Sequence, residues 1–217
     1  MRKLAYSLDD FEYLGAFGGD STAIISRPGQ FKDIEDLFRF AKNNPDKISY
    51  ASPGSATAPF LTMEAVRAER GLVMTAVHYK GTSPVVTSVL GGHTPIGVGG
   101  FEAVKDMVRA NKLVVLAVTG QKRDEDFPNI PTLEEIGLSA ANIDLWAGAW
   151  APKGTSKEVL AKLAKALERS ATDPEVIKRF RSTGYRAFWL PGDQMRAMAR
   201  RDNARATSVV KALGGGK

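Results

Sequence analysis

Ile48-Ser49-Tyr50-Ala51-Ser52-Pro53-Gly54-Ser55-Ala56-Thr57 decides the fold class of this chain. Its first five residues are predicted to form a strand, and the small residues after them open a helix over 58–70. The same order returns at once, with a strand over 72–79, the loop Lys80-Gly81-Thr82-Ser83 and a short helix over 84–90. Successive βα units of this kind predict an α/β fold with a parallel or mixed sheet flanked by helices.

Both loops have the features of an anion-binding site. Small residues let a ligand approach the backbone, and the first N–H groups of a helix are unpaired donors at the positive end of its dipole. Loops of successive βα units lie at one edge of a parallel sheet, where ligands bind in such folds. The alternative is that Ser55 or Thr57 only caps its helix. The predicted ligand-binding residues are Ser52, Gly54, Ser55, Ala56, Thr57, Tyr79, Lys80, Gly81 and Thr82.

The rest of the chain continues to alternate short apolar runs with helical patterns. No strand is predicted before residue 48. Residues 6–18 are polar with an incomplete apolar pattern, which is typical of a segment inside a fold and not of its first strand. The other predicted strands are 96–100, 112–119, 145–151 and 186–190, and the other predicted helices are 31–43, 101–110, 156–170, 173–183, 193–213 and a short one capped by Thr132 with Glu135 three residues later.

Composition excludes several classes of protein. The chain has no cysteine, which rules out disulfides and thiol nucleophiles, and no apolar run approaches the roughly 20 residues of a membrane span. The net charge of +6 favours anionic partners. Nucleic acid is not expected among them, because the densest basic cluster lies along one side of a predicted helix without an aromatic platform. That cluster, Arg196, Arg200, Arg201 and Arg205, is interpreted as a solvated helix face.

Enzymatic patterns are missing from the sequence. His78 and His93 have no metal-type spacing to another ligand, and the stretch 97–102 lacks the last glycine of a dinucleotide-binding fingerprint. The consecutive acids Asp124-Glu125-Asp126 are expected to be solvated on a polar loop. The prediction is therefore a binding protein without catalytic residues, metal or cofactor.

The loop residues also carry a family resemblance. Val77-His78-Tyr79-Lys80-Gly81 resembles the V-P-Y-K-G signature of the solute receptors of tripartite tricarboxylate transporters, often called Bug proteins, and residues 50–57 are similar to their Y-G-S-x-G-x-G-S loop. Further matches follow in the family's order. They are Leu90-Gly91-Gly92, residues 112–119 with Lys122-Arg123, residues 127–138, Trp146-Ala147-Gly148, residues 151–155 and Asp173-Pro174-Glu175-Val176.

The resemblance implies a periplasmic-binding-protein fold, in which two α/β lobes close on a small di- or tricarboxylate. Residues 1–19 would be a remnant of lobe one and the hinge, 20–145 lobe two, and 146–217 the C-terminal part of lobe one. The first strands of lobe one and the signal peptide are expected to be missing. The implied partners are membrane transporter subunits and the implied location is the periplasm, or the cytoplasm if Met1 is the native start.

Departures from the family pattern leave an alternative open. Phe60 stands where the family has histidine, His78 replaces the proline of V-P-Y-K-G, and Gly91-Gly92-His93-Thr94-Pro95 lacks an expected acid. A chain without the first strands of lobe one would expose sheet edges and apolar surface, which predicts a homodimer and a structural role without solute binding. An effector-sensing domain of a regulator ranks lowest, because no DNA-binding helix-turn-helix is attached.

Overall fold

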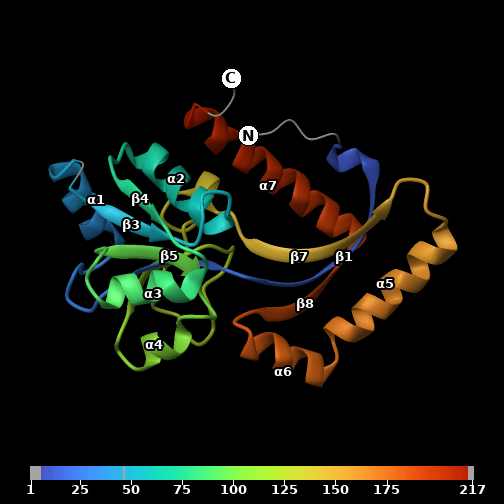
Figure 1. The fold of residues 1–217 in the computed structure, drawn as a ribbon. Coiled ribbons are helices and arrows are strands. Elements are labelled where there is room, and N and C mark those ends of the chain that lie inside the picture. Colours follow the sequence, from blue (N-terminus) through green and yellow to red (C-terminus); the bar gives the residue numbers. More distant parts are fainter. Residues whose placement is uncertain (1–5, 46, 215–217) are drawn as a thin grey trace. The chain divides into compact units, whose positions relative to one another are not determined.

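The computed structural model describes residues 6–45 and 47–214, which form two compact units. One unit combines the residues up to Asp20 with those from Trp146 onward, and the other runs from Ser21 to Leu145. The chain therefore passes from one unit to the other at residues 20–21 and returns at 145–146. Each unit has its own sheet and its own helices (Figure 1).

The unit formed by residues 21–145 is built on a five-stranded sheet in the order β4-β3-β5-β2-β6. β3 is parallel to β4 and to β5, whereas β2 is antiparallel to β5 and to β6, so the sheet is mixed. The strands are β2 (Thr22–Ser26), β3 (Ser49–Ser52), β4 (Thr75–His78), β5 (Ile96–Gly100) and β6 (Val114–Val118); the helices are α1 (Ile34–Asn43), α2 (Ala58–Arg70), α3 (Thr82–Leu90), α4 (Lys105–Arg109) and the 3-10 turn η2 (Ser139–Ala141).

Helices cover both faces of this sheet. Along β3, Ala51 belongs to the apolar cluster that contains Val85 and Val89 of α3, while its neighbour Tyr50 contacts Glu64 of α2. Because successive side chains of a strand point to opposite faces, α3 lies on one face and α2 on the other (Figure 1).

The second unit has a three-stranded sheet in the order β7-β1-β8, in which β1 and β8 are antiparallel. Figure 1 shows α7 along one side of this sheet, with α5 and α6 toward the other side. The elements are η1 (Leu8–Asp10), β1 (Phe11–Asp20), β7 (Leu145–Pro152), α5 (Lys157–Ala171), α6 (Pro174–Ser182), β8 (Arg186–Pro191) and α7 (Gly192–Ala212).

In the arginine cluster on α7, Arg196 and Arg200 are exposed and Arg201 and Arg205 are half-buried. Arg200 forms an ion pair of 2.7 Å with Asp9, and the guanidinium of Arg196 lies 5.1 Å from the centre of the Tyr13 ring. These contacts join α7 to the start of β1 and to the residues just before it. Arg196 and Arg200 are thus exposed, as predicted, and they also contact the residues at the start of the small sheet.

Three predictions about individual elements were wrong. β1 and β2 were not predicted, although β2 lies between β5 and β6 in the larger sheet. No α-helix forms after Thr132, even though the predicted capping contacts are present: the Thr132 N–H donates to Glu135 and the Glu135 N–H donates to the Thr132 hydroxyl. The chain makes turns here and then the 3-10 turn η2.

Candidate functional site

The two predicted loops lie side by side at one edge of the larger sheet. Ser52 and His78 are paired at the ends of the parallel strands β3 and β4. Just beyond them, the Tyr79 N–H donates to the Ser52 carbonyl oxygen at 2.7 Å, and the Gly81 N–H donates to the Pro53 carbonyl oxygen at 3.3 Å. The structure thus brings together both groups of predicted residues within one unit.

Each loop turns at a glycine that the backbone requires. Gly54 has φ of +144° and Gly81 has φ of +102°, conformations that residues with a side chain rarely adopt. Nothing lies within 4 Å of the position that a Cβ at Gly81 would take. That glycine is needed for its backbone conformation rather than for space.

The hydroxyl groups of Ser52 and Thr57 form hydrogen bonds with the backbone of the first loop and of the first turn of α2. Ser52 is fully buried, and its Oγ lies within hydrogen-bonding distance of the backbone of Gly54. The Thr57 hydroxyl donates to the Gly54 carbonyl oxygen at 2.9 Å and accepts from the Phe60 N–H at 3.4 Å, so Thr57 is the N-cap of α2. Ser55 and Ala56 are exposed. The first loop is therefore shaped by its own side chains.

The start of α2 offers few free donors to an anion. Pro59 has no N–H, and the N–H of Phe60 is bonded to Thr57, which leaves Ala58 among the first three helical positions. The start of α3 is different, because its N-cap is Gly81, which makes no side-chain cap. The N–H groups of Thr82 and Ser83 follow directly, with the exposed Lys80 just before the cap. The capacity to bind an anion lies more at α3 than at α2.

Tyr79 and Thr82 hold α3 in place. The Tyr79 hydroxyl donates to the Ser88 Oγ at 2.9 Å, and Ser88 shares a hydrogen bond of 3.0 Å with Thr94. The Tyr79 side chain also packs against the apolar cluster on the α3 face of the sheet. The Thr82 hydroxyl accepts from the Gly100 N–H at 3.4 Å, which ties the start of α3 to the end of β5. Both predicted residues therefore have a positioning role in this structure.

A pair of rings that was not predicted stands next to the first loop. The ring centres of Phe60, in the first turn of α2, and His78, at the end of β4, are 5.1 Å apart with an interplanar angle of 68°. Both residues are departures from the family pattern, and their contact with each other was not predicted. Strand alternation was the sequence signal that could have indicated this pair, because it places the side chain of residue 78 on the opposite face of the sheet from those of residues 77 and 79.

The glycine-rich stretch 97–100 forms strand β5 and not a cofactor loop. A Cβ added at Gly97 would lie 2.7 Å from Val85 and 2.8 Å from Val89, and one at Gly99 would lie 2.6 Å from Thr82 Cγ2. The glycines are thus the surface on which α3 packs. Close packing of α3 on β5 sets where the N-terminus of α3 lies.

A buried group of polar side chains lies beneath the first loop. The Tyr50 hydroxyl donates to Glu64 of α2, and Glu64 forms an ion pair of 2.7 Å with Arg67. Burial, together with the neighbouring carboxylate, raises the pKa of Tyr50, so its hydroxyl remains a hydrogen-bond donor. This group fixes α2 against β3 two residues before the loop begins.

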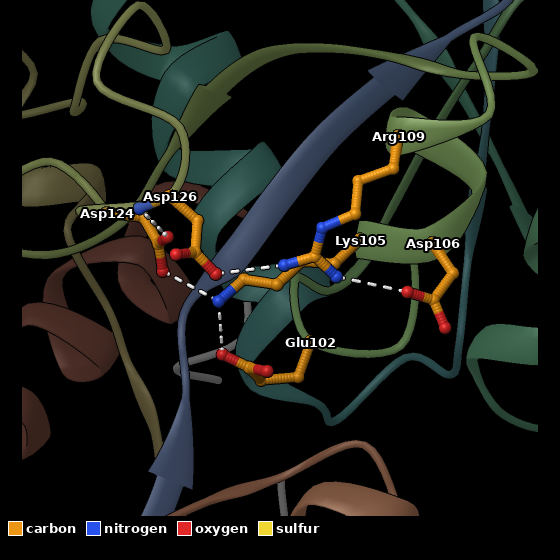
Figure 2. A network of polar contacts seen from close by, with 6 residues as sticks. All are labelled: Glu102, Lys105, Asp106, Arg109, Asp124 and Asp126. Carbon is orange, nitrogen blue, oxygen red and sulfur yellow. Dashed lines mark hydrogen bonds and ion pairs between the residues drawn. The ribbon is translucent and has the colours of Figure 1, made fainter.

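A charge network joins the loops that follow β5 and β6 (Figure 2). The two strands run in the same direction, because each is antiparallel to β2. Lys105 is nearly buried, and its Nζ lies 2.6 Å from Glu102 and 2.7 Å from Asp124. The same nitrogen lies 5.0 Å from the centre of the Phe101 ring. Burial alone would lower the pKa of Lys105, but the two carboxylates outweigh it and the pKa is raised.

Asp124 is therefore not simply solvated, contrary to the prediction, whereas Glu125 and Asp126 are exposed. Besides the pair with Asp124, Asp126 accepts from Arg109 at 2.9 Å, and Arg109 also contacts Asp106 at 3.0 Å (Figure 2). The described residues contain no group of three histidine or carboxylate side chains that could hold a metal ion. In the same described part, each helix is too short or too polar to cross a membrane.

Comparison with known proteins identifies relatives over nearly the whole chain. The family model described as tripartite tricarboxylate transporter family receptor matches residues 1–215. A protein of Cupriavidus necator, known only as a UPF0065 protein, is 29% identical over 206 residues, which are 94% of this chain. The chain spans 62% of the length of that relative.

Solved structures show the same fold. The periplasmic binding protein BugD is 28% identical, with a TM-score of 0.74 over 94% of this chain and 69% of its own. A protein of R. palustris solved with adipate has 23% identity and a TM-score of 0.77, covering 98% of this chain and 72% of its own. MatC of Rhodopseudomonas palustris, solved with malate, has 21% identity and a TM-score of 0.75, covering 96% and 73%. The predicted periplasmic-binding-protein fold is confirmed.

Proposed function

Because the chain belongs to the tripartite tricarboxylate transporter receptor family, we propose that it binds a small organic carboxylate, without catalysis, as the solute receptor of a transporter of this type. The membrane subunits of that transporter are its partners in this proposal, and the periplasm is its location. The family's description as a receptor supports both.

One observation carries the binding part of the proposal. Two strand-to-helix loops meet at the ends of parallel strands, and the helix that follows the second loop begins without a side-chain cap. Uncapped N–H groups at the positive end of a helix favour a carboxylate, and the exposed Lys80 adds a positive charge next to them. The groups proposed to contact the ligand are the backbone N–H groups of Thr82 and Ser83 and the side chain of Lys80. Ser52, Thr57 and Tyr79 position these loops.

The class of ligand is proposed from the neighbours. Adipate and malate, present in two structures with this fold, are both dicarboxylates. An anionic ligand also suits a chain with a net charge of +6, because the charge favours its approach. We therefore propose dicarboxylates as the first class to test.

The experiment is a panel of mono-, di- and tricarboxylates, measured by thermal unfolding and by calorimetric titration. A true ligand at 100 times its Kd is expected to stabilise the folded state by about 2.7 kcal/mol and to raise the Tm accordingly. Lys80→Gln is expected to weaken binding roughly two- to five-fold, as is usual for an exposed charge. Lys47→Gln is the matched control, because Lys47 is also exposed but precedes β3, at the opposite end of that strand from the loop. A folded wild-type protein that responds to none of the acids would contradict the proposal.

The relatives give no support to the predicted homodimer, which stays a prediction. Light scattering decides it, since a mass equal to one 23.4 kDa chain would contradict self-association. The same measurement serves the binding experiment, because it shows whether the titrated species is one chain or more.

A further inference from the structure

His78 stands next to the first loop and on the same face of the sheet as Ser52. The two residues are paired in register between the parallel strands β3 and β4. Paired side chains on neighbouring strands point to the same face, and the strands themselves lie about 4.8 Å apart. The His78 side chain therefore lies beside the loop that begins at Ser52, at the same edge of the sheet as the candidate site.

The imidazole is held in place and yet its nitrogens are available. Phe60 contacts it edge to face, with ring centres 5.1 Å apart, which restricts how the His78 ring turns. His78 is exposed, and among the residues that the structure describes none forms a hydrogen bond or ion pair with its ring nitrogens. An oriented imidazole without a protein partner can donate a hydrogen bond to a ligand oxygen.

The start of α3 and His78 are separate contacts for two separate groups. α3 covers the face of the sheet to which Ala51 points, whereas His78, paired with Ser52, points to the other face, so one carboxylate at the start of α3 would not also occupy His78. We propose that His78 contacts the second carboxylate of the ligand and so selects dicarboxylates over monocarboxylates. This inference rests on the proposed function, because it assigns a specificity-determining residue to that same site.

The test compares acids of equal length that differ by one carboxylate: succinate with butyrate and adipate with hexanoate. Calorimetric titration is performed on the wild type, on His78→Asn and on His93→Asn. His93 is the matched control, because it is exposed but follows α3 and precedes the start of β5, at the opposite edge of the sheet from the loops. In the His78→Asn protein, affinity for the dicarboxylates is expected to fall about ten-fold and affinity for the monocarboxylates less than two-fold. His93→Asn should change neither.

Phe60→Leu is a further variant to be titrated with the same acids. It leaves the imidazole in place but removes the ring that orients it, and a smaller loss of the same selectivity is expected. If the wild type binds none of the acids, the proposed function fails and this inference fails with it. If the wild type binds a dicarboxylate and His78→Asn, with an unchanged Tm, keeps its affinity and its selectivity, the inference alone is overturned.

Discussion

Lys105 is the residue at which charge and burial conflict most clearly in this chain. Its side chain is 11% exposed, and the partner carboxylates of Glu102 and Asp124 are 18% and 15% exposed. Removing one charge from such a group leaves the others buried without compensation. The network connects the loop after β6 to α4, so its loss would free that loop.

Lys105→Met is therefore expected to destabilise the protein by about 3 kcal/mol, measured by urea unfolding followed by circular dichroism. The triple variant Lys105→Met, Glu102→Gln, Asp124→Asn is the control and should recover more than half of that loss, since it leaves no unpaired carboxylate. The folded-state pKa of Lys105 is raised, so its contribution is fully present below the unfolded value of about 10.4 and declines as the pH rises through the folded value. Equal stability of Lys105→Met and the wild type at pH 7 would contradict the interpretation.

At the residue scale, the sequence predicts which loops matter better than what each side chain does. Glycines at 54 and 81 and small polar residues between a strand and a helix indicated both loops correctly. Thr57 and Tyr79 were predicted as ligand-binding residues, and in the structure their hydroxyls bond to Gly54, Phe60 and Ser88. Such bonds depend on the backbone path and on partners up to nine residues away, which local patterns do not specify.

Among the elements, the contact between α3 and β5 places the start of α3. The helix packs so closely on the strand that a Cβ at Gly99 would lie 2.6 Å from Thr82 Cγ2. Thr82 is also the residue whose hydroxyl bonds to the Gly100 N–H. The same residue thus sets both the packing of α3 and the position of its first N–H groups.

Gly99→Ala is expected to cost about 1–3 kcal/mol through overpacking, measured by thermal or urea unfolding. Adding Thr82→Ser should restore part of this loss, because serine keeps the hydroxyl but lacks Cγ2. The double variant is also the control. If Gly99→Ala lowered the free energy of unfolding only by restricting the backbone, Thr82→Ser would not restore it. A Gly99→Ala protein as stable as the wild type would show that α3 can move away without cost.

Strong periodicity and clear stop signals made the helices and most strands predictable, with α2 and β5 matching to the residue. β1 was missed because Gly15, Gly18 and Gly19 interrupt its pattern, and β2 because five buried residues with no alternation give little periodic signal. The helix after Thr132 was wrongly predicted because the capping contacts form without a helix to follow them. Local signals alone could not reveal that.

The whole molecule consists of two units that differ in how well their apolar side chains are buried. The core of residues 21–145 contains large side chains that are almost completely inaccessible, such as Ile24, Leu37 and Met63. Both units have some exposed apolar side chains, such as Val73 in one and Trp150 in the other, but among the described residues the second unit contributes only Met195 to the largest fully buried side chains. The family motifs are distributed along the whole chain, so their order predicted the fold of both units. Burial could not be predicted in this way, since it depends on which residues meet in space.

This difference predicts unequal protection against hydrogen exchange. Amide groups of β2 and β5, in a five-stranded sheet covered by buried side chains, are expected to exchange more slowly than those of β7 and β8, by about ten-fold or more. Hydrogen exchange followed by mass spectrometry of peptic fragments measures both units in one sample, so each serves as the reference for the other. A dicarboxylate that binds at the loops of β3 and β4 should slow exchange mainly around residues 52–57 and 79–83. Equal protection of the two sheets, or slower exchange in β7 and β8, would show that the half-exposed side chains are covered in solution.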